Sequence, residues 1–258
     1  MKIIHNNENR EKLIDLWVRV FGDEREYVKL LFPSDKVCCN SFALSEDGEI
    51  ISALHLLDCY LQFNGKKYIG KYLYAAATDE KHRGKGLMSE LIYEALDFCK
   101  EAKIDFVSLV PAGESLYKYY ERFGFIPAMK RETVFLPDES GFDEYTEISG
   151  KEYFSVRAEA LTDFISFYEN SCEYAVRCLE YSGKRFYKTV YNQYFITEKN
   201  SSFFDELITD SKAMRCFRDS SVERKNCVIE KYGMLFPINP ELKRDWNYED
   251  IYMNIALD

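Results

Sequence analysis

Residues 72–91 read YLYAAATDEKHRGKGLMSEL, and they predict a β-strand, a glycine-rich loop and an α-helix in direct succession. The apolar run at 72–78 is typical of a buried strand. From Leu87 to Cys99, apolar residues recur at three- and four-residue intervals, which favours a helix that continues to about residue 102. The order strand, loop, helix therefore organises the N-terminal half of the chain.

The loop at 79–86 combines glycines with basic side chains. Gly84 and Gly86 leave room for a ligand to approach the backbone, because they carry no Cβ. The positive end of the macrodipole lies at the N-terminus of the following helix, where backbone N–H groups bind phosphate or pyrophosphate. The loop thus predicts an anion site. For Arg83 and Lys85 an ordinary solvated basic loop is the alternative interpretation.

The other segments of residues 1–137 alternate between helical and strand patterns. Asp47-Gly48 and Asn64-Gly65 are typical of tight hairpin turns and predict an antiparallel meander of three strands. The remaining expected elements are a helix at 8–22, a short helix at 23–31, a strand at 106–110, a helix at 114–123 and a strand at 125–136.

Charge divides the chain near Pro137. Residues 1–137 hold 19 basic and 21 acidic residues, whereas residues 138–258 hold 15 and 23. The turn-forming, acidic stretch at 137–141 is the candidate linker between two domains, 1–137 and 138–258. For the second domain, a smaller α+β domain, the expected elements are a helix at 167–181 and strands at 186–196, 226–237 and 251–257.

Composition excludes several classes of function. The 34 basic and 44 acidic residues give a net charge of −10, the wrong sign for a protein that neutralises nucleic-acid phosphates. No apolar run is long enough to cross a membrane and no signal-peptide core is present, so we expect a cytoplasmic protein without a membrane partner. The eight cysteines show no zinc-site spacing, and we expect no metal.

Two motifs together resemble the GNAT superfamily of N-acetyltransferases. Residues 83–88, RGKGLM, match its acetyl-CoA signature except at Met88, where a glycine or alanine is usual. Residues 119–125, YYERFGF, match the segment that carries the family's catalytic tyrosine, and Tyr120 falls on that position. The resemblance covers residues 1–136. It implies an α/β (α+β) fold with a central mixed, mostly antiparallel sheet flanked by helices.

This resemblance implies direct transfer of an acetyl group from acetyl-CoA to a small primary amine or a lysine side chain. Tyr120 would act as general acid and protonate the departing thiolate. Backbone amides of the strand before the loop would polarise the thioester carbonyl. The residues expected to contact the cofactor are Ala76, Ala77, Thr78, Arg83, Gly84, Lys85, Gly86, Leu87, Met88, Ser89 and Ser115.

Alternatives stay open for the chemistry. Tyr120 also fits a packing role, because it shares an apolar helical face with its neighbours. No general base is visible: Asp58 and Asp79 flank the strand, and proton loss to water is an adequate route. Because Met88 departs from the signature and no base is visible, a second class of function remains open. In this class the protein is a non-catalytic acyl-CoA-binding or regulatory domain.

Residues 76–78 and 110–115 look closest to the first domain of acetyltransferases of the enhanced-intracellular-survival type. That narrower resemblance implies that 138–258 is a degenerate GNAT-like half that walls or covers the substrate side. It also implies that the carboxylate of Asp258 could act as the general base. The alternative is that the C-terminus is frayed or lies at a sheet edge and has no catalytic role. The acidic second half favours cationic acceptors such as polyamines and aminoglycoside-like compounds, unless its charge serves solubility alone. No oligomer is visibly encoded.

Overall fold

The computed structural model describes residues 2–5, 9–25, 28–29, 40–136, 144–148, 164–167, 176–181, 184–189, 194–196, 214–218 and 228–253. The chain forms two compact units. The first consists of Met1–Tyr60, Tyr68–Ile126 and Met234–Asp245, and the second of Leu61–Lys67, Pro127–Gly233 and Trp246–Asp258. The predicted linker at 137–141 and Asp258 lie outside the described residues, as do parts of the helix expected at 23–31.

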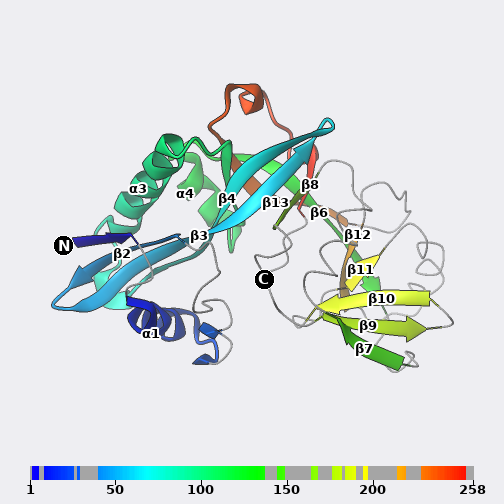
Figure 1. Cartoon of the computed structure of the whole chain (residues 1–258), viewed down its shortest axis with the longest axis horizontal. Helices are drawn as coiled ribbons and strands as arrows, with labels where there is room; N and C mark the ends of the chain where they lie inside the picture. The colour runs from blue at the N-terminus through cyan, green and yellow to red at the C-terminus, as the bar shows by residue number, and fades with distance from the viewer. Residues whose placement is uncertain are drawn as a thin grey trace. The chain divides into compact units, whose positions relative to one another are not determined.

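The first unit is built on a mixed sheet. Its strands lie in the order β1-β2-β3-β4-β5-β13, and the first four are seen side by side in Figure 1. The pairs β1–β2, β2–β3 and β5–β13 are antiparallel, whereas β4 and β5 are parallel. The strands are β1 (Lys2–His5), β2 (Asn40–Glu46), β3 (Glu49–Phe63), β4 (Lys66–Thr78), β5 (Phe106–Leu109) and β13 (Val228–Pro237). The predicted mixed, mostly antiparallel sheet is thereby confirmed; β1 was not predicted.

Both hairpin turns form where the sequence predicts them. Asp47 and Gly48 have φ angles of 51° and 84°, and Asn64 and Gly65 have 50° and 72°. Two consecutive positive φ angles define the type I′ turn, whose twist matches that of the flanking strands. The predicted meander is therefore β2, β3 and β4.

Helices cover both faces of this sheet. They are α1 (Arg10–Phe21), α3 (Leu87–Glu101) and α4 (Glu114–Glu121). Leu54 and Leu56 of β3 belong to the apolar cluster that includes α3, whereas the ring of His55 between them stacks on Trp17 of α1 at 5.6 Å. Because successive strand residues point to opposite faces, α1 and α3 lie on opposite sides of the sheet.

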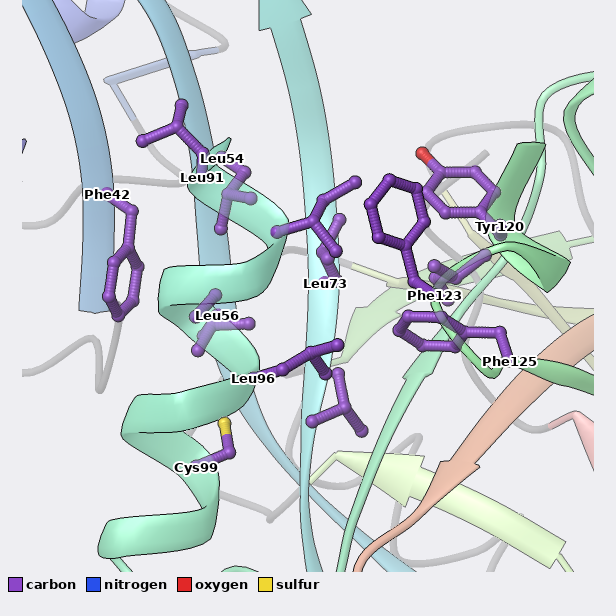
Figure 2. Close-up of a cluster of buried hydrophobic side chains, with 14 of the residues drawn as sticks. Phe42, Leu54, Leu56, Leu73, Leu91, Leu96, Cys99, Tyr120, Phe123 and Phe125 are labelled. Atoms are coloured by element: carbon purple, nitrogen blue, oxygen red, sulfur yellow. The ribbon is translucent and has the colours of Figure 1, made fainter. Parts of the chain in front are cut away.

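The core lies between α3 and the sheet (Figure 2). Leu91, Leu96 and Cys99 of α3 belong with Leu73 of β4 to this cluster of buried residues. Burial raises the pKa of the Cys99 thiol to about 12, so it stays protonated and packs as a small apolar side chain. Cys59 is buried in the same way, as expected; of the other six cysteines the structure describes no side chain.

The last residues of β13 complete the first unit. Met234–Pro237 pair with β5, and the backbone N–H groups of Ile238 and Asn239 donate to the carbonyl of Asp105. The Asp105 carboxylate accepts from the Asn239 side chain and from the backbone of Ile69, both at 2.7 Å. Met234–Asp245 thus join the first unit, although the sequence analysis assigned them to the second domain.

Gly70 allows β4 and β5 to approach each other. It pairs with Phe106, and a Cβ on Gly70 would overlap the Phe106 ring, which is fully buried and has no room to move. We expect Gly70→Ala to lower the free energy of unfolding by about 2–3 kcal/mol in urea denaturation, because overpacking outweighs the better strand propensity of alanine. Phe106→Leu in that background should recover part of the loss. A change below about 0.5 kcal/mol would contradict this.

The described part of the second unit is formed mainly by strands. Its pairs include β6–β12 and β9–β10, both antiparallel, and β14–β6, which is parallel. The strands are β6 (Ile126–Leu136), β7 (Glu144–Ile148), β8 (Phe164–Phe167), β9 (Val176–Tyr181), β10 (Lys184–Thr189), β11 (Tyr194–Ile196), β12 (Met214–Arg218) and β14 (Ile251–Met253). β10 and β11 divide the single strand expected at 186–196.

The prediction of a helix at 167–181 is wrong for its last six residues. Val176–Tyr181 form β9, which pairs with both β7 and β10. The helical spacing of Cys172, Ala175 and Leu179 was the misleading signal. Pairing with two strands satisfies the backbone on both edges of β9, and that long-range gain overrides a local pattern. Residues 168–175 lie outside the described residues.

Candidate active site

The parallel ladder between β4 and β5 is short. It consists of three residue pairs, from Gly70–Phe106 to Tyr72–Ser108. β5 then ends at Leu109 while β4 continues to Thr78. Within this continuation Ala75 has a φ of 47°, a conformation that costs an alanine about 1 kcal/mol and bends the strand. β4 therefore leaves its neighbour and presents backbone groups that β5 does not pair.

The end of β4 leads into the predicted anion site. Gly84 and Gly86 have φ angles of 76° and 80°, and a Cβ on either would meet nothing within 4 Å. The first backbone bond of α3 runs from Glu90 N–H to the Gly86 carbonyl at 3.1 Å. The N–H groups of Leu87, Met88 and Ser89 consequently have no acceptor within the helix and can bind an anion at its positive end.

Asp79 fixes the start of this loop. Its backbone N–H donates to Ile51 at 2.9 Å, and its carboxylate accepts from the backbone N–H of Lys81 at 3.0 Å. Arg19 of α1 forms an ion pair with the same carboxylate at 2.7 Å. The Lys81 hydrogen bond and Arg19 hold the pKa of Asp79 below its usual value, so Asp79 stays ionised at neutral pH.

Ser52 and Arg83 hold the last residues of β4. The Ser52 hydroxyl lies 3.2 Å from the carbonyl of Ala77 and 2.8 Å from the hydroxyl of Thr78. The Nε–H group of Arg83 donates to the carbonyl of Thr78 at 3.1 Å. Ala77, Thr78 and Arg83 are among the residues predicted from the sequence, whereas Ser52 and Arg19 are not. No local pattern marks those two, since both act from other elements.

Met88, the departure from the family signature, packs against the core cluster, as does Ala76. Its side chain therefore contributes to the core, and its backbone N–H remains in the first turn of α3. Lys85 is exposed in the loop, and Ser115 is exposed in the first turn of α4.

Tyr120 lies on α4 with its ring in the core and only 7% of the residue exposed. The rings of Tyr119 and Phe125 pack on it at 5.2 and 5.9 Å, and its hydroxyl points away from Phe125 (Figure 2). Burial, and to a lesser extent Tyr119, raises the pKa of Tyr120 to about 12. The hydroxyl is therefore protonated at neutral pH. Packing and proton donation are compatible, because they use different ends of the side chain.

The two carboxylates considered as bases already have partners. Asp58 forms an ion pair with Lys71, and Asp79 forms its ion pair with Arg19. Among the residues that the structure describes, no cluster of side chains could hold a metal ion, and no helix is long and apolar enough to span a bilayer.

A family model described as an acetyltransferase (GNAT) domain matches residues 5–128. This part of the chain is a GNAT domain. The resemblance drawn from the two motifs is thus confirmed. Among curated proteins, the GNAT domain is similar to YhbS of Escherichia coli strain K12, described as an uncharacterized N-acetyltransferase. The two are 31% identical over 83 residues, which is 32% of this chain and 46% of YhbS, so the match spans about half of that relative.

Solved structures share the fold over a longer range than the GNAT domain. A probable N-acyltransferase of Enterococcus faecalis V583 aligns with a TM-score of 0.62 at 15% identity. The alignment covers 92% of this chain and 72% of the Enterococcus chain. Eis1 of Mycobacterium abscessus aligns with a TM-score of 0.61 at 10% identity. The alignment covers 93% of this chain and 74% of the Eis1 chain. At these identities the comparison establishes the fold alone.

Proposed function

We propose that the protein is an acetyl-CoA-dependent N-acetyltransferase that transfers the acetyl group directly to a primary amine. The main support for the proposal is the path of β4, which lies within the GNAT domain. This strand leaves β5, bends at Ala75 and leads through Gly84 and Gly86 to the free N–H groups of α3.

Each part of the cofactor has a place in this proposal. The pyrophosphate binds to the backbone N–H groups of Leu87–Ser89, with Arg83 and Lys85 adding positive charge. The pantetheine arm follows the open edge of β4, where backbone amides near Ala76 and Ala77 polarise the thioester carbonyl. Ser115 is exposed in the first turn of α4, and we assign its hydroxyl to the pantetheine arm.

In the chemical step the amine nitrogen forms a bond to the carbonyl carbon and the carbon–sulfur bond breaks. The sulfur leaves as a thiolate and takes the hydroxyl proton of Tyr120. The amine loses its own proton to water, because Asp58 and Asp79 are held in ion pairs. Water then restores the proton on Tyr120.

The raised pKa of Tyr120 predicts the shape of the pH profile. A donor must be protonated, and Tyr120 loses its proton only near pH 12, above the ordinary tyrosine value. We expect kcat to rise with pH as the amine deprotonates and not to fall up to about pH 10, because Tyr120 stays protonated over that range. A fall in kcat between about pH 8 and about pH 10 in the intact protein would contradict the assignment.

We also propose that the acceptor is cationic. The net charge is −10, and the acidic excess is concentrated in residues 138–258. A negative potential concentrates cations and disfavours anionic acceptors. Polyamines, aminoglycoside-like compounds and lysine peptides therefore rank above acidic metabolites.

Mass spectrometry of acetylated products tests this function and the acceptor class together. The panel contains cationic and anionic amines, each at low and high salt. We expect acetylated cationic amines, with kcat/KM falling as salt screens the field. An anionic best acceptor, or a kcat/KM that salt leaves unchanged, would overturn the acceptor class. Tight acetyl-CoA binding without any product would favour the non-catalytic acyl-CoA-binding class instead.

A further inference from the structure

Arg122 follows α4 and lies over an aromatic ring. Its guanidinium carbon is 4.7 Å from the centre of the Tyr119 ring and 5.9 Å from that of Phe123. A cation–π contact of this kind stabilises this position of the guanidinium even at an exposed site. Arg122 is exposed, so the guanidinium is both positioned and accessible to a ligand.

Most hydrogen-bond capacity of Arg122 is unused within the described part of the chain. Its Nε–H donates to the carbonyl of Tyr119 at 3.4 Å, and no described carboxylate pairs with it. A guanidinium has five N–H donors in a planar fork that suits phosphate oxygens. The arrangement therefore leaves the terminal nitrogens of Arg122 for an outside anion.

Tyr119 connects this cation to the first turn of α3. The Tyr119 hydroxyl lies 3.3 Å from the hydroxyl of Ser89, and Ser89 is the third residue of α3. Ser89 also carries one of the three N–H groups to which the pyrophosphate is assigned. A continuous series of contacts thus leads from the pyrophosphate position through Ser89 and Tyr119 to Arg122.

Coenzyme A has a second anionic group close to its pyrophosphate. The ribose that carries the pyrophosphate on its 5′ oxygen carries a phosphate on its 3′ oxygen, one sugar ring away. When the pyrophosphate binds at the N-terminus of α3, the 3′-phosphate lies one sugar ring from that position. Ser89 and Tyr119 connect the same position to Arg122.

We propose that Arg122, held over the Tyr119 ring, binds the 3′-phosphate of coenzyme A and so selects the full cofactor over its 3′-dephospho form. The inference rests on the proposed function, because it assumes that acetyl-CoA binds at the N-terminus of α3. It assigns one specificity-determining contact, the Arg122 guanidinium to the 3′-phosphate. Tyr119 is a positioning residue in this assignment.

Calorimetric titration of the full chain with CoA and with 3′-dephospho-CoA tests the assignment. We expect the wild type to bind CoA about tenfold more tightly, the size of one charge-assisted phosphate contact at an exposed site. Arg122→Gln should bring the two dissociation constants within about twofold of each other and leave that of 3′-dephospho-CoA unchanged. Tyr119→Leu, which removes the ring under Arg122, should reduce the preference partly.

Lys103→Gln is the matched control. It removes the same charge from an exposed residue beyond the far end of α3, about 22 Å from the loop for a helix of this length. This variant should keep the wild-type preference. Equal affinities of the wild type for the two ligands, or an unchanged preference in Arg122→Gln, overturn this inference and leave the proposed function standing. If neither ligand binds, the proposed function fails, and the inference fails with it.

Discussion

Gly86→Asp is expected to weaken acetyl-CoA binding by about a thousandfold while the protein stays folded. A carboxylate at this position would lie next to the pyrophosphate. Two like charges about 4 Å apart repel by about 4 kcal/mol near a protein surface, and each 1.4 kcal/mol is a factor of ten in affinity. Titration of acetyl-CoA into wild type and variant measures the loss.

Two controls separate charge from backbone strain. Gly86→Ala imposes the same unfavourable φ of 80° without the charge, and nothing lies within 4 Å of the added methyl group. Gly65→Asp places an aspartate at a φ of 72° in the hairpin turn that precedes β4, at the opposite end of this strand from the loop. Gly86→Ala should lose far less affinity, and Gly65→Asp none. Near-wild-type binding by Gly86→Asp would place the pyrophosphate elsewhere.

Tyr120→Phe is expected to lower kcat by about a hundredfold or more, with little change in the affinity for acetyl-CoA. It removes the proton donor, and general acid catalysis contributes factors of this size. The ring, which packs on Tyr119 and Phe125, is retained. A lower kcat with unchanged binding is the signature of an interaction made only in the transition state.

Tyr117→Phe is the matched control for that variant. Tyr117 is a second buried tyrosine on α4 and belongs to the same apolar cluster. Its variant should keep kcat close to the wild-type value. If Tyr120→Phe and Tyr117→Phe had the same kcat, Tyr120 would have a packing role only and would not be the proton donor.

The parts of the fold that local signals encode could be predicted from the sequence. The two type I′ turns depend on Asp-Gly and Asn-Gly, and α3 depends on one apolar stripe behind a glycine loop. β1 and the return of β13 to β5 could not be predicted, because partners far apart in the sequence determine them. β9 was misread for the same reason, since its pairing with β7 and β10 outweighs a helical spacing.

The same distinction holds for the candidate site. Gly84, Gly86 and Tyr120 stand in contiguous motifs, so they can be proposed as site residues from the sequence alone. The bend at Ala75 has no sequence signal, because alanine has no preference for positive φ. Arg19 and Ser52 hold the loop and the end of β4 from other elements, and only the folded chain brings them there.

Release of free thiol from acetyl-CoA by the wild-type protein, with and without primary amines, tests the central claim most directly. Acetyl-CoA is supplied at saturation, so that a binding defect cannot hide the chemistry. We expect thiol release that depends on an amine and equals the amount of acetylated amine formed. Saturable acetyl-CoA binding with no amine-dependent thiol release on any member of the panel would contradict it.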